Sequence, residues 1–390
     1  KEHWNLEEGK SYFVERNGSS MIAFHLPKKD FQGFHIVASH SDSPTYRIKE
    51  QPEMSVEKHY TKLNIERYGG MIPETWFDRP LSVAGRIIIE ENGQIKDQLV
   101  NVDRDLMIIP NLAIHMSRSS NESKQLNPQK DLLPLCGGNL TKDGFEEMIA
   151  KEAGVEKEDI LSYDLFLYNR MRGTTLGINE EFVAAPKLDD LECAYSSIEG
   201  MLNAKLSKDY VTVCAVFDNE EVGSGTKQGA GSTFFPEVLK RISYLCGKNE
   251  EEYYMAVADS FMLSADNAHA VHPNYQDKTD PTNRPYINEG IVLKYNASQK
   301  YTTDANSAAL VKYLCKKEKI KCQVFFNRSD MLGGSTLGNI LTGQVSIKAA
   351  DIGLPQLSMH STYETAGCKD LDDMITLMGS FYELGKEVQI

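Results

Sequence analysis

Residues 213–225 read VCAVFDNEEVGSG, and the interpretation of the whole chain starts from this stretch. The apolar run at residues 210–217 is rich in β-branched residues, which is typical of a strand buried on both faces. It turns abruptly into three acids, Asp218, Glu220 and Glu221. Adjacent carboxylates at the end of a buried strand repel each other, so a divalent metal ion is the simplest neighbour to expect. One glutamate would bind the metal while the other takes a proton. A solvated acidic turn is the alternative interpretation.

Length and composition are those of a soluble enzyme with two domains. The chain has 390 residues, of which 41% are hydrophobic and 25% charged. Its net charge of −14 argues against a nucleic-acid partner or an anionic membrane surface. No run of about 18 apolar residues occurs, so we expect no transmembrane helix. We also expect no signal peptide, and the missing initiator Met suggests that a short N-terminal piece precedes residue 1.

The seven cysteines are odd in number and show no CxxC spacing. This pattern favours reduced thiols over a disulfide framework or a cysteine-based zinc site. We therefore expect a cytoplasmic protein.

A histidine and an aspartate follow the short strand predicted at residues 34–38. His40 and Asp42 are two positions apart, so in an extended segment their side chains point the same way. Asp42 could accept a ring N–H of His40 and leave the other ring nitrogen for a metal. A purely structural pair is the alternative.

Further candidate ligands lie at the boundaries of other predicted elements. Asp189 and Asp190 begin a predicted helix with apolar positions at 191, 194, 195, 198, 201 and 202. Acids at a helix start also have a simpler explanation, because they cap the free N–H groups there. Asp266 follows the apolar residues 261–265, and His360 follows residues 356–359.

These candidates share one context in an α/β chain. In an open α/β sheet, ligands bind at the carboxyl ends of the strands. Five separate segments each place a histidine or an acid at this edge. Helix capping and exposure to solvent alone do not readily explain so many. Two histidines with three or four carboxylates suit a pair of divalent metals that prefer N and O ligands. The candidates are His40, Asp189, Glu220, Glu221, Asp266 and His360.

The middle of the sequence differs from both ends. Residues 61–170 contain short predicted strands, turns and few helices, so we expect an inserted β-rich domain there. Residues 1–60 and 171–390 then form the catalytic domain. His115 lies in the insert, where a satisfied, half-buried histidine is the simplest interpretation. The Gly-rich residues 333–338 lack the lysine of a phosphate loop, so we do not expect phosphate binding.

Taken together, the motifs resemble the M18 metallopeptidases, the aspartyl aminopeptidase group within the clan of dizinc exopeptidases. The resemblance extends from the first residues to the last. The segments that carry it are residues 39–44 (SHSDSP), 188–190 (LDD), 217–224 (FDNEEVGS), 264–275 (SADNAHAVHPNY) and 357–361 (LSMHS).

The resemblance implies a three-layer α/β/α catalytic domain with a mixed, mostly parallel sheet, and two divalent metal ions per subunit. Zinc is expected first, although cobalt and manganese accept the same ligands. The implied roles are His40 and Asp266 as ligands of one metal, Glu221 and His360 as ligands of the other, Asp189 as the bridge, Glu220 as the base that moves the proton of the attacking water to the leaving amine, and Asp42 as the group that orients His40.

The resemblance also implies an aminopeptidase that acts on peptides, with Asp or Glu preferred at the N-terminus. His115 would reach the active site of a neighbouring subunit, and Lys294 would meet the acidic side chain. Gly334, Ser335 and Thr336 would line the substrate backbone. The insert would serve in dimerisation, and the assembly would be a tetrahedral homododecamer built from dimers.

Two other functions are compatible with the same residues. One is another dinuclear hydrolase of the clan, such as a carboxypeptidase or an N-deacylase. The other is a shell-forming scaffold without activity, although the presence of every ligand position and of Glu220 argues against it.

Overall fold

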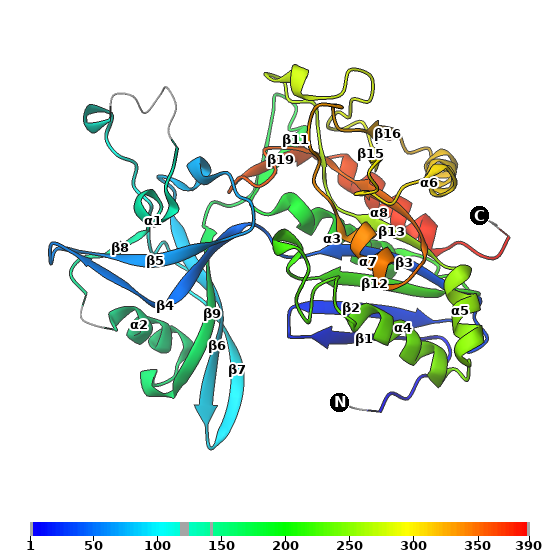
Figure 1. Cartoon of the computed structure of the whole chain (residues 1–390), viewed down its shortest axis with the longest axis horizontal. Helices are drawn as coiled ribbons and strands as arrows, with labels where there is room; N and C mark the ends of the chain where they lie inside the picture. The colour runs from blue at the N-terminus through cyan, green and yellow to red at the C-terminus, as the bar shows by residue number, and fades with distance from the viewer. Residues whose placement is uncertain (1–2, 118–124, 141–142, 388–390) are drawn as a thin grey trace. The chain divides into compact units, whose positions relative to one another are not determined.

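The computed structural model describes residues 3–117, 125–140 and 143–387 (Figure 1). The chain divides into two compact units. The first comprises Lys1–Ser43, Thr174–Met359 and Glu364–Ile390, and the second comprises Pro44–Gly173 with His360–Tyr363.

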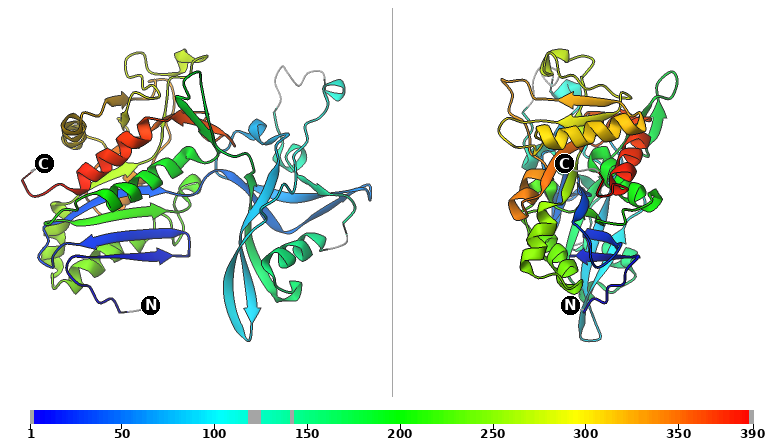
Figure 2. Two further views of the ribbon diagram at one scale, coloured as in Figure 1. Left: turned by 180° about the vertical axis from the view of Figure 1, so that it is seen from behind. Right: turned by 90° about the vertical axis from the view of Figure 1, so that its right-hand side faces the viewer.

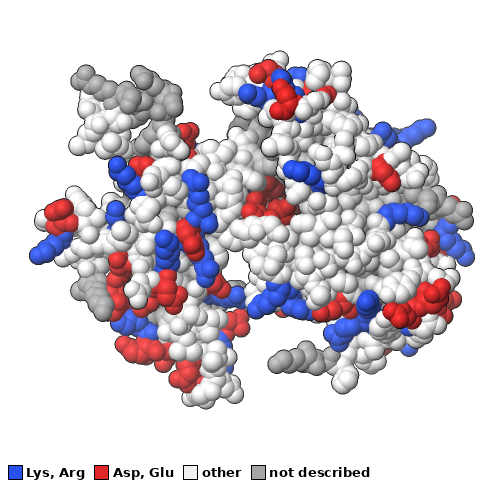
Figure 3. Space-filling view, viewed as in Figure 1, with Lys and Arg blue, Asp and Glu red and all other residues white. Residues whose placement is uncertain are grey.

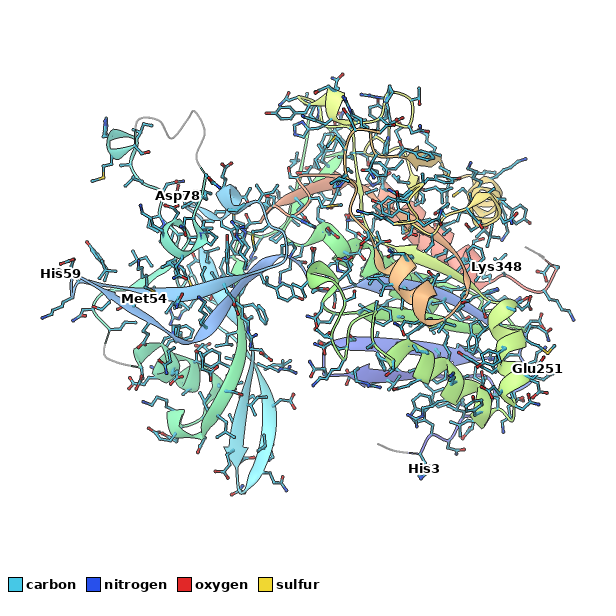
Figure 4. All side chains as sticks on the ribbon, in the orientation of Figure 1. His3, Met54, His59, Asp78, Glu251 and Lys348 are labelled. Atoms are coloured by element: carbon cyan, nitrogen blue, oxygen red, sulfur yellow. The ribbon has the colours of Figure 1, made fainter. Side chains whose placement is uncertain are left out.

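The first unit is built on a mixed sheet that has eight strands within the described residues. Its four central strands run parallel to one another, so their carboxyl ends meet at one edge. Lys348, labelled in Figure 4, begins one of them and marks the opposite, amino edge. In sheet order the strands are β1 (Lys10–Arg16), β2 (Ser20–Leu26), β12 (Val211–Phe217), β3 (Phe34–His40), β13 (Phe261–Ala265), β17 (Lys348–Gly353), β15 (Ile291–Lys294) and β16 (Cys322–Phe325).

Helices cover both faces of this large sheet (Figure 1, Figure 2). Successive strand residues point to opposite faces. Thus Ile36 of β3 packs in a core with α4, α5 and α7, whereas Val37 packs in a second core with α3, α6 and α8. This arrangement confirms the predicted α/β class with three layers. The helices are α4 (Phe234–Leu245), α5 (Glu250–Ala258) and α7 (Leu337–Gln344) on one side, and α3 (Leu188–Asn203), α6 (Ala305–Glu318) and α8 (Asp370–Tyr382) on the other.

A smaller sheet continues from the carboxyl edge of the large one. Its strand β14 begins three residues after β13 ends, and β18 begins two residues after β17. The chain therefore passes from the large sheet to the smaller one at the edge where the candidate ligands lie. Within the described residues its order is β10 (Thr174–Leu176), β11 (Phe182–Ala185), β19 (Glu364–Gly367), β18 (Pro355–Leu357) and β14 (Ala268–His269).

The second unit is an antiparallel sheet with a core of its own. The compact unit begins at Pro44 rather than near residue 61, because β4 pairs along most of its length with β5. In order, its described strands are β7 (Gln94–Asn101), β6 (Leu81–Glu91), β9 (Ile160–Asn169), β4 (Thr45–Val56), β5 (Tyr60–Tyr68) and β8 (Leu135–Gly137), and its helical elements are η1 (Pro73–Trp76), η2 (Ile114–Met116), α1 (Pro128–Asp131), α2 (Gly144–Ala153) and η3 (Lys157–Asp159).

Helix α3 exists as predicted, but the predicted apolar stripe describes its buried face poorly. Leu191, Tyr195 and Leu202 are exposed. The buried face includes Cys193, Ala194, Ser197, Gly200 and Met201. Small residues let α3 lie close to α8, and a Cβ added at Gly200 would be 2.9 Å from Met378. Close backbone approach, rather than apolar periodicity, therefore decides which side of α3 is buried.

None of the described helices has the length and apolar character that a membrane span needs. On the described surface visible in Figure 3, Lys and Arg side chains are scattered among Asp and Glu side chains. All seven cysteines are free thiols.

Candidate metal centre

His40 is the last residue of β3, and its side chain is 1% exposed. Its Nδ1 lies 3.1 Å from the Asp42 carbonyl oxygen and 3.4 Å from the Asp42 carboxylate. Its Nε2 lies 3.5 Å from Asp189 Oδ1. One ring nitrogen therefore faces Asp42, and the other faces a carboxylate that begins helix α3. This is the orientation expected of a histidine that ligates a metal through Nε2.

Asp42 also holds the turn that follows β12. Its two carboxylate oxygens accept hydrogen bonds from the backbone N–H groups of Glu220, at 3.0 Å, and Glu221, at 3.1 Å. Both glutamates begin η4 (Glu220–Val222), which Asn219 enters with a left-handed φ of 64°. One carboxylate thus joins the ends of two neighbouring parallel strands and sets the positions of His40, Glu220 and Glu221 together.

The start of α3 supplies two buried acids, Asp189 and Asp190. Asp190 Oδ2 accepts the backbone N–H of His40 at 3.2 Å, and Glu364 accepts the N–H of Asp189 at 3.0 Å. The residue at the N-cap is Lys187, and no side chain caps the helix there. The Asp190 carboxylate therefore does not cap its own helix, as the simpler explanation would have it. It accepts the backbone N–H of His40 at the end of β3 instead.

Asp266 directly follows β13, and its backbone is fixed from two sides. Its N–H donates to the Ile352 carbonyl of β17 at 3.0 Å. A Cβ added at Gly353 would lie 2.0 Å from the Asp266 carbonyl oxygen, so the close approach requires glycine. From the other side, the Lys294 ammonium donates to the carbonyls of Asp266, at 2.7 Å, and Asn267, at 3.2 Å.

The side chains gathered here have the chemistry of a metal site. His40, Asp189 and Asp266 offer ligand atoms within 4.8 Å of one another, and so do His40, Glu220 and Glu221. Imidazole nitrogen and carboxylate oxygen suit zinc and related divalent ions. Asp189 and Asp266 are buried and the two glutamates are half-buried. The alternative of a fully solvated acidic turn therefore does not describe these residues.

Crowding changes the proton affinity of several groups. Burial, together with the nearby Asp266 carboxylate, raises the pKa of Glu220 to about 7. Burial also raises the pKa of Asp266, although Lys294 opposes this shift. Burial by itself lowers the pKa of His40, but contacts with Asp189 and Asp42 raise it well above its ordinary value. A divalent cation among these groups would favour their deprotonated forms.

A family model described as aminopeptidase I zinc metalloprotease (M18) matches residues 1–382. The chain belongs to the M18 family. It is therefore a metalloaminopeptidase. The "Probable M18 family aminopeptidase 2" of Clostridium novyi (strain NT) is 46% identical over 98% of this chain and 90% of that protein. The family is thus supported by the sequence along almost the whole chain.

Solved structures show the same fold for this M18 chain. A chain in the cryo-EM structure of the Ape4 and Nbr1 complex is 37% identical, with a TM-score of 0.93 over 97% of this chain and 77% of that one. The S. cerevisiae mApe1 dodecamer structure is 28% identical, with a TM-score of 0.83 over 96% of this chain and 85% of that one.

His360 begins the short segment 360–363, which groups with the second unit. It follows Met359 of the first unit directly in the chain. Its backbone is left-handed, with a φ of 67°, and its Nδ1 lies 2.8 Å from the Gly70 carbonyl oxygen. A carbonyl contact at Nδ1 favours the tautomer that offers Nε2 as a ligand.

The predicted substrate residues lie in three different environments. His115 is exposed in η2 of the second unit. Gly334 and Ser335 are exposed in the first unit, whereas Thr336 is buried and starts α7 as its N-cap. Lys294 is 1% exposed at the end of β15.

Three residues that support the site received no role from the sequence. Asp190 was visible beside Asp189, but nothing distinguished a ligand from a supporting acid. Asn267 donates from its side chain to the Leu188 carbonyl at 3.0 Å, which joins the segment before Asp189 to the segment after Asp266. Glu364, which accepts the Asp189 N–H, lies in a short polar stretch with no motif of its own.

Proposed function

We propose that this aminopeptidase releases N-terminal residues from peptides, with Asp and Glu preferred, by attack of an activated water on the first peptide bond. The observation that carries the proposal is the convergence of His40, Asp189, Glu220, Glu221 and Asp266 at the carboxyl edge of the large sheet. Five carboxylate and imidazole groups from four separate segments meet there, and Asp42 holds three of them in place.

Two divalent ions, zinc first among them, would be held by five residues. Bound there, they would polarise the scissile carbonyl and lower the pKa of water toward neutrality. Asp189 is suited to bridge both ions because it lies beside His40 and has its backbone fixed by Glu364. The assigned ligands are His40 and Asp266 for one ion, Glu221 and His360 for the other, and Asp189 for both.

Glu220 is the general base in this proposal. Its neighbour Glu221 is assigned as a ligand, and Asp42 holds the backbone N–H groups of both residues. Glu220 is half-buried at the start of a 3-10 turn, so its carboxylate sits at a fixed place beside the ligands. It would accept a proton from the attacking water and deliver it to the leaving amine.

Lys294 is the proposed source of the acidic preference. An ammonium has three donors, and two of them bind the carbonyls of Asp266 and Asn267. Its Nζ also lies 3.8 Å from Asp266 Oδ2. In this proposal the remaining donor would turn to the carboxylate of an N-terminal Asp or Glu. If Asp266 served a metal ion, an apolar substrate would leave this buried cation without a carboxylate partner, which disfavours such a substrate. The exposed Gly334 and Ser335 would contact the peptide backbone.

The proposed assembly is a tetrahedral homododecamer built from dimers through the second unit, in the cytoplasm. The similar S. cerevisiae mApe1 is described as a dodecamer. His115 is exposed on a short 3-10 turn flanked by the exposed Ile114 and Met116. An exposed histidine among exposed apolar residues is suited to enter the active site of a neighbouring subunit.

Hydrolysis of Asp-, Glu- and Leu-aminoacyl reporters, with and without a chelator, tests the proposal. We expect the acidic reporters to react at least about 10-fold faster than the Leu reporter. Chelation should abolish turnover and zinc should restore it. Equal rates on all three would contradict the acidic preference. Turnover of an N-acetylated Asp reporter would indicate an N-deacylase or carboxypeptidase instead, and no turnover of any reporter would indicate a scaffold.

Lys294→Leu tests the assignment of the preference, and Lys312→Leu, on the exposed side of α6, is its control. The first change should reduce the Asp rate far more than the Leu rate. An equal loss on both reporters would contradict the role of Lys294.

A further inference from the structure

Asp351 is a fully buried acid in the middle of β17, outside the proposed metal ligands. Its Oδ2 accepts two hydrogen bonds from Thr302, one from the backbone N–H at 2.5 Å and one from the hydroxyl at 2.7 Å. Its Oδ1 accepts a short hydrogen bond from the Thr336 hydroxyl. The Asp351 carboxylate thus joins two segments that are 34 residues apart in the chain, the loop before α6 and the loop before α7.

A second contact joins the same two segments. The Lys300 ammonium donates to the Gly333 carbonyl at 2.8 Å. Gly333 and Thr336 bracket Gly334 and Ser335, so the exposed part of this loop is held at both of its ends. The hydroxyl of Thr336 binds Asp351 inside the protein, and of the three predicted substrate residues in this loop Gly334 and Ser335 are exposed.

The first segment leads back to the metal centre. Tyr301 lies between Lys300 and Thr302, and the Lys294 ammonium lies 5.1 Å from the centre of its ring. Lys294 in turn donates to the Asp266 carbonyl. In the sheet, Lys294 is the register partner of Asp351. A continuous series of contacts therefore runs from the loop of Gly334 through Asp351 and Lys294 to the turn of Asp266.

The packing around the carboxylate leaves little freedom. A Cβ added at Gly338, in the first turn of α7, would lie 2.8 Å from Asp351 Oδ2 and 3.0 Å from the Ser264 side chain. The start of α7 therefore lies directly against the carboxylate. The Thr303 hydroxyl accepts the backbone N–H of Asp351 at 2.8 Å, which holds the strand to the same loop.

We propose that Asp351 and Thr336 are positioning residues that anchor the Gly333–Thr336 loop and the 300–303 segment in the arrangement that binds the substrate backbone. The inference rests on the proposed function for the identity of the substrate. It changes the role of Thr336, which would hold the loop from behind and leave substrate contact to Gly334 and Ser335. The anchor should therefore act on substrate binding more than on the chemical step.

Thr336→Val removes the hydroxyl with little change of shape, and Thr336→Ser keeps it. Thr342→Val is the matched control, because the Thr342 hydroxyl bonds only within α7, to the Gly338 and Asn339 carbonyls. We expect Thr336→Val to raise KM for an Asp-containing dipeptide about 10-fold, with kcat within about 2-fold, because a hydrogen bond to a charged acceptor is lost. Thr336→Ser and Thr342→Val should keep KM near the unsubstituted value. Asp351→Asn, if it folds, should raise KM further.

Hydrogen exchange provides a readout that does not require activity. In Thr336→Val, amides of residues 299–303 and 333–336 should exchange at least several-fold faster than in the unsubstituted protein, whereas in Thr342→Val they should not. Unchanged KM with unchanged exchange, or a lower Tm alone, would overturn the proposal. If the unsubstituted protein hydrolyses no aminoacyl reporter, the proposed function fails, and exchange alone then decides whether the anchor exists.

Discussion

Strand β3 carries one histidine near each end, and the two have opposite properties. His35, near the amino end, stacks on Tyr210 with ring centres 4.0 Å apart and also contacts Phe381. Burial among these rings lowers the pKa of His35 to about 3. His40, at the carboxyl end, is buried just as deeply, but Asp189 and Asp42 flank its two ring nitrogens and raise its pKa.

The difference comes from what each edge of the sheet presents. At the amino edge, β3 is surrounded by the apolar starts of its neighbours, including Val211 and Phe261. At the carboxyl edge, the chain leaves each strand through a turn that carries acids. Burial alone favours the neutral form of a histidine, whereas carboxylates on both sides of a buried ring favour its protonated form, or a cation beside it.

Replacing each histidine in turn should give the largest contrast. His40→Phe should remove one metal ion and lower kcat/KM at least about 10⁴-fold, because the ions supply most of the activation of water. His35→Phe should retain full metal content and activity within about 3-fold, since the phenyl ring can stack on Tyr210. Metal analysis measures the metal content of each variant, and reporter hydrolysis measures its kcat/KM. Equal loss of metal in the two variants would remove the distinction between the edges.

At the carboxyl edge, the proposed general base Glu220 should be needed for turnover but not for metal binding. Glu220→Gln should lower kcat about 10³-fold while both metal ions stay bound, because the amide cannot accept the proton. Glu251→Gln, at an exposed position of helix α5 and labelled in Figure 4, is the control and should leave kcat and metal content unchanged. Substantial turnover by Glu220→Gln with bound metal would assign the base elsewhere.

A smaller effect is expected for the residue that joins the two strand ends. Asp42→Asn should weaken metal affinity about 10- to 100-fold, because Asp42 orients His40 and holds the N–H groups of Glu220 and Glu221. Asp30→Asn, at an exposed site just before the same strand, is the matched control. Competition with a chromophoric chelator measures the affinity. An unchanged affinity in Asp42→Asn would show that the turn is held without it.

The smallest effect concerns stability at the amino edge. The folded-state pKa of His35, about 3, is lower than the unfolded value near 6.5, so the unfolded state binds the proton first. The contribution of His35 to the free energy of unfolding is therefore fully present above pH 6.5 and is lost as the pH falls toward 3. Between pH 6.5 and 5.5 the loss should be about 1 kcal/mol. Over the same pH range, the free energy of unfolding of His35→Phe should fall by about 1 kcal/mol less than that of the unsubstituted protein.

Denaturant unfolding in the presence of a chelator measures this difference without a contribution from bound metal. His3→Phe, at an exposed histidine near the N-terminus that Figure 4 labels, is the control. If the unsubstituted protein, the control and His35→Phe all lose the same stability over this pH range, His35 takes up its proton in the folded protein and the contrast between the edges fails.

Much of the fold could be predicted because local patterns carry it. For example, Asn17 and Gly18 between two short apolar stretches are a hairpin signal, and β1 and β2 pair across them. The apolar runs that end in acids predicted central strands of an α/β sheet, and β3, β12 and β13 are such strands. The predicted start of the insert, residue 61, lies inside β5, because a local change in composition does not show that β4 pairs with β5 in the same sheet.

The sequence by itself determined which residue types stand at strand ends, because alternation along a buried strand and an abrupt change to acids are both local. It therefore identified His40, Glu220 and Asp266 as candidates together. Only the tertiary structure decided how each group is held. Asp42 binds N–H groups 178 and 179 positions away, and Asp189 is held by Glu364, 175 positions away. A buried polar side chain must find a hydrogen-bond partner, but no periodicity in the sequence specifies which distant backbone group will be within reach.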